Sequence, residues 1–271
     1  MSSSIRAYAV SAVRVARRAG FKPGGREERL VFVVGSPRSG TTFTGSALGS
    51  LPGFVDLDEV TPLKGALPRL AGLPPGEAAE ELRAILERVR LLGLARGLRG
   101  VEQTPETSFS LEAALLAYPL AHAVHVVRDG RDVVCSLLER GWFRADRGGG
   151  DDAGHAYGGH ARFWVEPERR DEFESASEAR RAAWAWRRYV AAARALPERT
   201  TELRYEQLVS DPRGEAERVA EAIDAHAAPL QEAFARVHGS SLGRWRRDLT
   251  PEQLADVETE AGALLSELGY A

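Results

Sequence analysis

The sequence contains a single cysteine, Cys135, among its 271 residues. One cysteine cannot form an intrachain disulfide, so nothing in the composition indicates an oxidising compartment, and we expect a cytoplasmic protein. No apolar run is long enough for a signal peptide or a membrane-spanning helix, so we expect no integral membrane span. The formal net charge is only −3, which provides no general attraction to nucleic acid or to a membrane surface.

Hydrophobic residues make up 44% of the chain and charged residues 28%, which fits one α/β domain over residues 1–271. Within it, residues 1–29 are an N-terminal extension. Its first part combines apolar side chains with Arg6, Arg14, Arg17 and Arg18, and a Pro-Gly-Gly loop follows. A basic helix of this kind could lie on anionic lipid. We expect it instead to pack on its own domain.

The strongest motif lies between Leu30 and Phe43. Residues 30–34 are apolar and mostly β-branched or aromatic, as in a parallel strand that is covered on both faces. A glycine-rich loop and a helix to about Leu51 follow, and the unpaired N–H groups of such a helix start favour an anion. Four side chains add donors to this predicted phosphate or sulfate cradle, namely Arg38, Ser39, Thr41 and Thr42. The alternative is a glycine-rich turn without a ligand.

The cradle departs from the phosphate loop of ATPases at one position. Gly35 and Gly40 have the spacing of that loop, but Thr41 stands where the loop has its lysine. The lysine normally reaches the β- and γ-phosphates, so its replacement argues against a triphosphate. A P-loop kinase or NTPase remains an alternative function.

A second motif runs from His122 to Arg140. Residues 122–127 predict another buried strand, so Arg128 lies at the carboxyl edge of the sheet, where open α/β sheets bind ligands. Ser136 and Arg140 are four residues apart on one face of the helix that follows. A guanidinium beside a hydroxyl suits a phosphate dianion. The alternative is a surface ion pair between Arg128 and Asp129.

The segment 51–62 interrupts the helical pattern, and we expect it to cross the top of the sheet. It carries three carboxylates beside the predicted anion site, on Asp56, Asp58 and Glu59. A carboxylate there could act as a general base toward an acceptor hydroxyl. An ordinary solvated acidic loop accounts for this stretch equally well.

Two further loops carry weaker signals. Residues 143–178 lose all periodicity, which predicts a loop or lid on the acceptor side. Its histidines and aspartates, His155, His160, Asp151 and Asp152, have poor spacing for a metal site. Near the C-terminus, three arginines surround Trp245 and fit a polyanion site or a solvated loop; they are Arg244, Arg246 and Arg247. Thr250 is the expected N-cap of the last helix, with Pro251 as its first residue.

These motifs, in this order, resemble the sulfotransferases that use 3′-phosphoadenosine-5′-phosphosulfate (PAPS), most closely the tyrosylprotein sulfotransferase-like and bacterial branch. The resemblance runs from about Leu30 to Tyr270, with the middle loop unmatched. It implies a three-layer, P-loop-like fold in which helices flank a central, mainly parallel sheet. The segment from Arg38 to Thr42 is similar to the family's 5′-phosphosulfate loop.

The resemblance also implies how the rest of the nucleotide is bound. Arg128, Ser136 and Arg140 are similar to the family's 3′-phosphate motif. Tyr205 falls where the family contacts the nucleotide. The loop Gly243–Arg246, with Arg244 and Trp245, looks like the one that closes over PAPS.

For catalysis, the resemblance favours Glu59 as the general base and Asp58 as its neighbour. Gln103 stands where the family commonly has a lysine that stabilises the transferring sulfuryl group, so this chain lacks that charge. The implied activity is sulfuryl transfer from PAPS to a hydroxyl, with adenosine 3′,5′-bisphosphate (PAP) as product and no metal. The acceptor could be a peptide tyrosine, a glycan or a small natural product, and the oligomeric state is open. A second alternative is a nucleotide-binding protein without catalysis.

Overall fold

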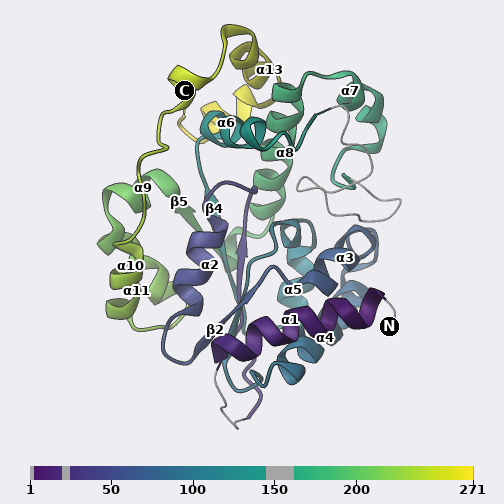
Figure 1. Ribbon diagram of the computed structural model, residues 1–271, viewed down its shortest axis with the longest axis vertical. Helices are drawn as coiled ribbons and strands as arrows, with labels where there is room; N and C mark the ends of the chain where they lie inside the picture. The colour runs from purple at the N-terminus through teal and green to yellow at the C-terminus, as the bar shows by residue number, and fades with distance from the viewer. Residues whose placement is uncertain (1–2, 20–24, 145–161, 271) are drawn as a thin grey trace.

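The computed structural model describes residues 3–19, 25–144 and 162–270, and its centre is a parallel sheet of five strands in the order β2-β3-β1-β4-β5. The strands are β1 (Val31–Val34), β2 (Phe54–Asp58), β3 (Arg99–Glu102), β4 (His122–Val127) and β5 (Thr200–Arg204). All strands run in the same direction, so their carboxyl ends meet at one edge. Figure 1 shows helices on both sides of this sheet, so the predicted α/β layered fold is confirmed.

The helices are α1 (Ser3–Ala19), α2 (Thr41–Gly49), α3 (Thr61–Leu70), α4 (Pro75–Leu92), α5 (Leu111–Ala117), α6 (Gly130–Arg140), α7 (Arg170–Ser175), α8 (Glu178–Ala193), α9 (Tyr205–Ser210), α10 (Pro212–Ala222), α11 (Ala227–Phe234), α12 (Trp245–Asp248) and α13 (Pro251–Glu267). Short 3₁₀ helices, η1 (Pro105–Ser110), η3 (Pro167–Arg169) and η4 (Pro197–Arg199), join some of them.

Alternation along β1 divides the core into two layers. Phe32 and Val34 face one apolar cluster, which the side chains of α3, α4 and α5 complete. Val31 and Val33 face the other cluster, together with side chains of α2, α10 and α11. Every residue of β1 is therefore buried, as its continuous apolar sequence predicts.

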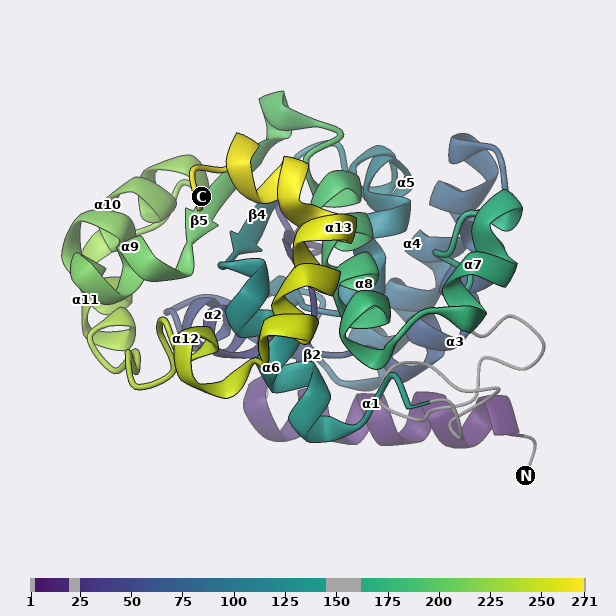
Figure 2. The same cartoon turned by 90° about the horizontal axis from the view of Figure 1, so that it is seen from above.

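A third apolar cluster lies beyond the carboxyl edge of the sheet and joins α6, α8 and α13. It buries the large aromatic side chains of α8, namely Trp184, Trp186 and Tyr189. Figure 2 shows α13 lying across α6 and α8 in the view from above. These aromatic residues are thus core residues, and they hold α6 beside the carboxyl edge of the sheet.

The segment 51–62 does not cross the top of the sheet, which corrects our prediction. Residues 54–58 form the edge strand β2, paired in parallel with β3. Val55 and Leu57 face the core, whereas Asp56 faces the other way, toward Ser46 of α2, at 3.1 Å. The alternation of apolar and acidic residues has the period of a strand, and α2 and α1 both pack against it, so Asp56 is buried as well as Val55 and Leu57.

Residues 143–178 are not irregular throughout. Within them, η3 and α7 are helical, and Phe173 of α7 is buried against Trp164 and Trp184. The contacts of Phe173, together with the hydrogen bond from Arg181 to its carbonyl oxygen at 3.1 Å, fix a helix too short to produce a periodic pattern. The histidines and aspartates considered as metal ligands, His155, His160, Asp151 and Asp152, lie outside the described residues.

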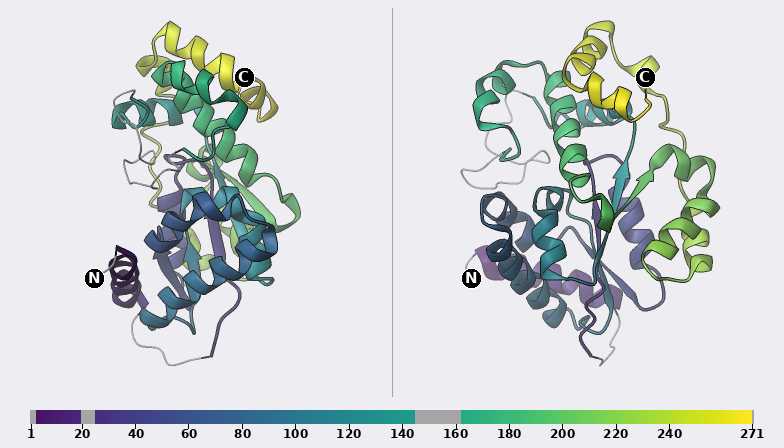
Figure 3. Two further views of the ribbon diagram at one scale, coloured as in Figure 1. Left: turned by 90° about the vertical axis from the view of Figure 1, so that its right-hand side faces the viewer. Right: turned by 180° about the vertical axis from the view of Figure 1, so that it is seen from behind.

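The N-terminal helix α1 packs on β2, α3 and α4, as expected for a helix that covers its own domain. Figure 3 places it low against the sheet, far from α13. Within the described part of the chain, no helix is both long and apolar enough to span a membrane.

His125 of β4 gives stability a predictable dependence on pH. Its side chain is fully buried, and burial lowers the pKa of the imidazole from 6.5 to about 3. Between these values the unfolded chain binds a proton that the folded protein does not, so acid destabilises the fold. When the pH is lowered from 7.5 to 5, the free energy of unfolding should fall in both proteins, but by about 2 kcal/mol less in His125→Leu than in the wild type. Urea unfolding at both pH values measures this difference, and an identical loss in the two proteins would contradict it.

Candidate anion-binding site

The loop between β1 and α2 is shaped by two residues in left-handed backbone conformations. Arg38 has φ +72° and Gly40 has φ +106°. A Cβ atom on Gly40 would lie 2.7 Å from the ring of Tyr205, so only glycine fits there. Among the described residues no side chain caps the start of α2, so its first N–H groups face the space in front of the loop.

Arg128 follows β4 directly and is buried. Its guanidinium donates to the hydroxyl of Ser241 at 3.0 Å, contacts the carboxylate of Asp132 at 3.4 Å, and lies over the ring of Tyr205 at 4.9 Å. Its carbonyl oxygen accepts a hydrogen bond from the indole of Trp186 at 3.1 Å. The third apolar cluster thus fixes Arg128 in position.

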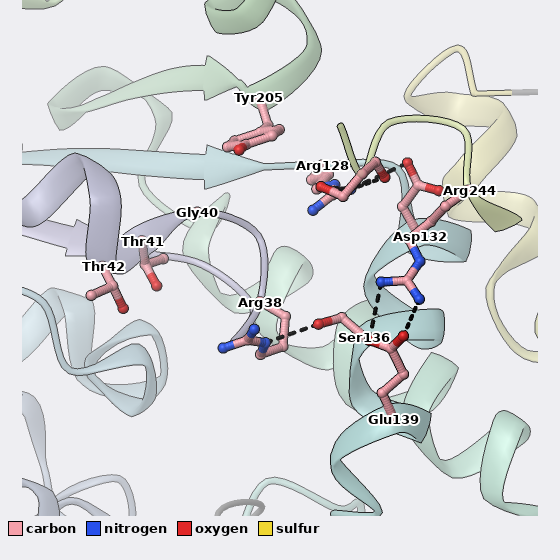
Figure 4. Close-up of a pocket in the computed structure, with 11 residues that line it drawn as sticks. Arg38, Gly40, Thr41, Thr42, Arg128, Asp132, Ser136, Glu139, Tyr205 and Arg244 are labelled. Atoms are coloured by element: carbon pink, nitrogen blue, oxygen red, sulfur yellow. Dashed lines mark hydrogen bonds and ion pairs between the residues drawn. The ribbon is translucent and has the colours of Figure 1, made fainter. Parts of the chain in front are cut away.

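The two motifs, far apart in sequence, meet in one cavity of about 300 Å³. Nε of Arg38 donates to the hydroxyl of Ser136 on α6, at 3.0 Å. Figure 4 shows Arg38 and Arg128 approaching the same space from opposite sides. The lining residues are Arg38, Gly40, Thr41, Thr42, Arg128, Asp132, Ser136, Glu139, Tyr205, Ser241 and Arg244.

The charges in this cavity are unevenly compensated. Arg244 pairs with Glu139 and with Asp248, the latter at 2.7 Å. Arg38, by contrast, forms no ion pair within the described residues. Burial lowers the pKa of Arg38, and the nearby positive charges of Arg140 and Arg128 lower it further. A guanidinium stays charged in proteins, so a bound anion would relieve this repulsion.

Two buried donors strengthen the case for an anion. The hydroxyl of Ser39 and Nε of Arg128 have no hydrogen-bond partner among the described residues. Buried polar atoms without partners are rare because each costs free energy. Of the two, Arg128 lines the cavity, and together with the hydroxyls of Thr41, Thr42 and Ser136 it forms a donor set that suits phosphate or sulfate oxygens.

Glu59 lies just past β2 and does not line this cavity. Its carboxylate pairs with the ammonium group of Lys64 on α3 at 2.9 Å, and 40% of its side chain is exposed. The same ammonium group lies 3.5 Å from Glu106. Glu59 is therefore an accessible carboxylate beside a fixed cation.

Gln103 points away from the cavity. Its side chain is buried against α2, where a Cβ atom on Gly45 would lie 2.4 Å from its oxygen. Its amide nitrogen donates to Asp56 at 3.3 Å and to Asp58 at 3.4 Å. The structure thus places Gln103 among the carboxylates that precede Glu59.

Eight of the predicted binding residues line the cavity, and three others lie beside it. Arg140 is exposed, Ser39 is buried under the loop, and the backbone N–H of Trp245 donates to Asp132 at 3.1 Å. Three lining residues were missed, namely Asp132, Glu139 and Ser241. Only Asp132 carried a signal, because it stands four residues after Arg128 at the start of a helix.

Comparison with known proteins places the chain in a family. Residues 77–229 match the sequence model described as Sulfotransferase family. The chain belongs to the sulfotransferase family. A comparison with curated proteins finds no match.

Solved sulfotransferase structures share the fold at low sequence identity. The sulfotransferase domain of the Synechococcus PCC 7002 olefin synthase aligns with a TM-score of 0.53 at 16% identity, over 89% of this chain and 96% of that domain. The sulfotransferase domain of the curacin biosynthetic pathway aligns with a TM-score of 0.57 at 14% sequence identity, over 89% of this chain and 98% of that domain. Sulfotransferase STF9 of Mycobacterium avium aligns with a TM-score of 0.51 at 15% sequence identity, over 97% of this chain and 81% of that chain. These similarities support the P-loop-like fold.

Proposed function

We propose that this sulfotransferase transfers the sulfuryl group of PAPS to an acceptor hydroxyl. The observation that carries the proposal is the single cavity lined by both Arg38 and Arg128. PAPS has an anionic group at each end of its ribose, and each would need its own cation. The cavity offers a cation and hydroxyl donors at both ends.

The loop Arg38–Thr42 would hold the 5′-phosphosulfate. Its hydroxyls and the N–H groups at the start of α2 suit tetrahedral oxyanions. Arg128 and Ser136 would hold the 3′-phosphate, with Tyr205 between the two ends. Arg244, with Trp245 and the rest of its loop, would cover the nucleotide.

Sulfuryl transfer resembles phosphoryl transfer in needing mainly positioning and charge stabilisation. The acceptor oxygen would attack sulfur in line, forming a new O–S bond, while the bond from sulfur to the bridging phosphate oxygen breaks. Glu59 would take the hydroxyl proton. PAP would leave with the electron pair, its charge stabilised by Arg38 and the loop amides. Gln103, which has no charge, would contribute to this step only through the residues it holds.

Thermal unfolding with candidate ligands tests the proposal against its two alternatives. At about 100 times its dissociation constant, PAP should stabilise the protein by about 2.7 kcal/mol, and ATP with magnesium should not. Selective stabilisation by ATP with magnesium would instead indicate a P-loop kinase or NTPase.

A transfer assay distinguishes an enzyme from a protein that only binds the nucleotide. Radiolabelled PAPS is incubated with a panel of phenols, tyrosine peptides, glycans and small alcohols. We expect label in at least one class of acceptor. Binding of PAP without transfer to any member would support the nucleotide-binding alternative.

A further inference from the structure

Two carboxylates at the end of β2 lie between a cation and an amide. On one side, the guanidinium of Arg18, from α1, contacts Asp56 at 3.2 Å and Asp58 at 3.3 Å. On the other side, the amide nitrogen of Gln103 donates to both residues. We call Asp56 and Asp58 the acidic pair.

The acidic pair also fixes the backbone that leads to Glu59. The N–H of Asp58 donates to the carboxylate of Asp56 at 2.8 Å, and the N–H of Glu59 donates to that of Asp58 at 2.9 Å. Asp58 has φ +64°, a left-handed conformation that is unfavourable for most residues. These contacts must compensate for the strain, so the position of Glu59 depends on the acidic pair.

The acidic pair needs a cation to stay in place. Asp56 is almost fully buried, and burial raises its pKa, which the Arg18 charge and the N–H of Asp58 oppose. Gln103 supplies hydrogen bonds but no charge. Arg14 reaches Asp58 only at 3.9 Å. Arg18 is therefore the one cation that contacts both carboxylates among the described residues.

We propose that Arg18 is a positioning residue, which acts through the acidic pair to hold Glu59 where the reaction needs it. The positive charge beside the acidic pair comes from Arg18 of α1, so the residue at position 103, which contacts the same two carboxylates, can be neutral. This inference rests on the proposed role of Glu59. It assigns a function to α1 beyond covering the sheet.

Amide hydrogen exchange of Arg18→Ala tests the proposal without any substrate. Loss of the cation should speed exchange at the Asp58 and Glu59 amides by about tenfold, the equivalent of about 1.4 kcal/mol. Arg17→Ala is the matched control, because Arg17 is exposed on the same helix and forms no ion pair within the described residues. Arg18→Lys should retain most of the protection. Wild-type exchange at both amides in Arg18→Ala would overturn the proposal.

A second-site variant separates charge from packing. Lysine at position 103 would approach the acidic pair from the opposite side, so Gln103→Lys in the Arg18→Ala background should restore at least half of the lost protection. If exchange in the double variant is as fast as in Arg18→Ala, the proposal that a positive charge holds the acidic pair in place is wrong.

Turnover then connects the acidic pair to catalysis. Arg18→Ala should lower kcat for sulfuryl transfer about tenfold and leave the KM for PAPS unchanged, with recovery in the double variant. An Arg18→Ala protein with altered exchange but wild-type kcat would overturn the positioning role. If the wild type transfers no sulfuryl group, the proposed function fails, and the exchange data alone decide whether Arg18 holds the segment.

Discussion

Glu59→Gln is expected to slow sulfuryl transfer by roughly a hundred- to ten-thousandfold, the loss typical of a missing general base. Glutamine keeps the size of the side chain and can still contact Lys64, but it cannot accept the acceptor proton at neutral pH. Because Glu59 does not line the cavity, the affinity for PAP should be unchanged. The initial rate of PAP release with an acceptor from the panel, together with calorimetry, measures the two quantities separately.

Glu106→Gln is the matched control for this variant. Glu106 lies 3.5 Å from the same Lys64 ammonium group, so its replacement removes a negative charge from the same cation. We expect turnover within about tenfold of the wild type. Full activity in Glu59→Gln, or an equal loss in both variants, would contradict the assignment of Glu59 as the base.

Arg128→Ala should weaken PAP binding by roughly 30- to 1,000-fold. Truncating one partner of a buried, charged contact costs about 2–4 kcal/mol, and each 1.4 kcal/mol is tenfold in affinity. Arg128 is buried, held by Trp186, and has a free Nε within the described residues, so it has both the position and the capacity to bind a phosphate. Calorimetric titration with PAP gives the change directly.

Two controls restrict this result to the 3′-phosphate. Arg247→Ala removes an exposed arginine that does not line the cavity, and should leave affinity unchanged. Adenosine 5′-phosphosulfate lacks the 3′-phosphate, so it should bind wild type and Arg128→Ala with similar affinity. An equal loss for both ligands would show that Arg128 stabilises the cavity in general and does not recognise the 3′-phosphate.

Local sequence was sufficient to predict the strands that carry the two anion motifs. A continuous apolar run predicted the strand at 30–34, as expected for a strand that is buried on both faces. The mostly apolar segment 122–127 gave the bounds of β4, although it contains His122 and the buried His125. Because β1 and β4 are parallel, the loops that follow them both lie at the carboxyl edge of the sheet. The convergence of Arg38 and Arg128 thus followed from topology, whereas their roles remain proposals.

The features that escaped prediction depend on tertiary contacts. Glu139 lines the cavity beside Arg244, and Ser241 beside Arg128, and both of these contacts involve the loop after α11, which is far from α6 in the sequence. The environment of Gln103 was equally hidden. Sequence alone showed only that position 103 lacks a charge, because the arginine that contacts the same two carboxylates, Arg18, lies in a helix far away in the chain.

A crystal structure of the complex with PAP tests the central claim most directly. We expect the 5′-phosphate at the N–H groups of the loop Arg38–Thr42 and the 3′-phosphate within hydrogen-bond distance of Arg128 and Ser136, in the one cavity. A nucleotide bound elsewhere, or one whose phosphates contact only one of these two motifs, would contradict the account.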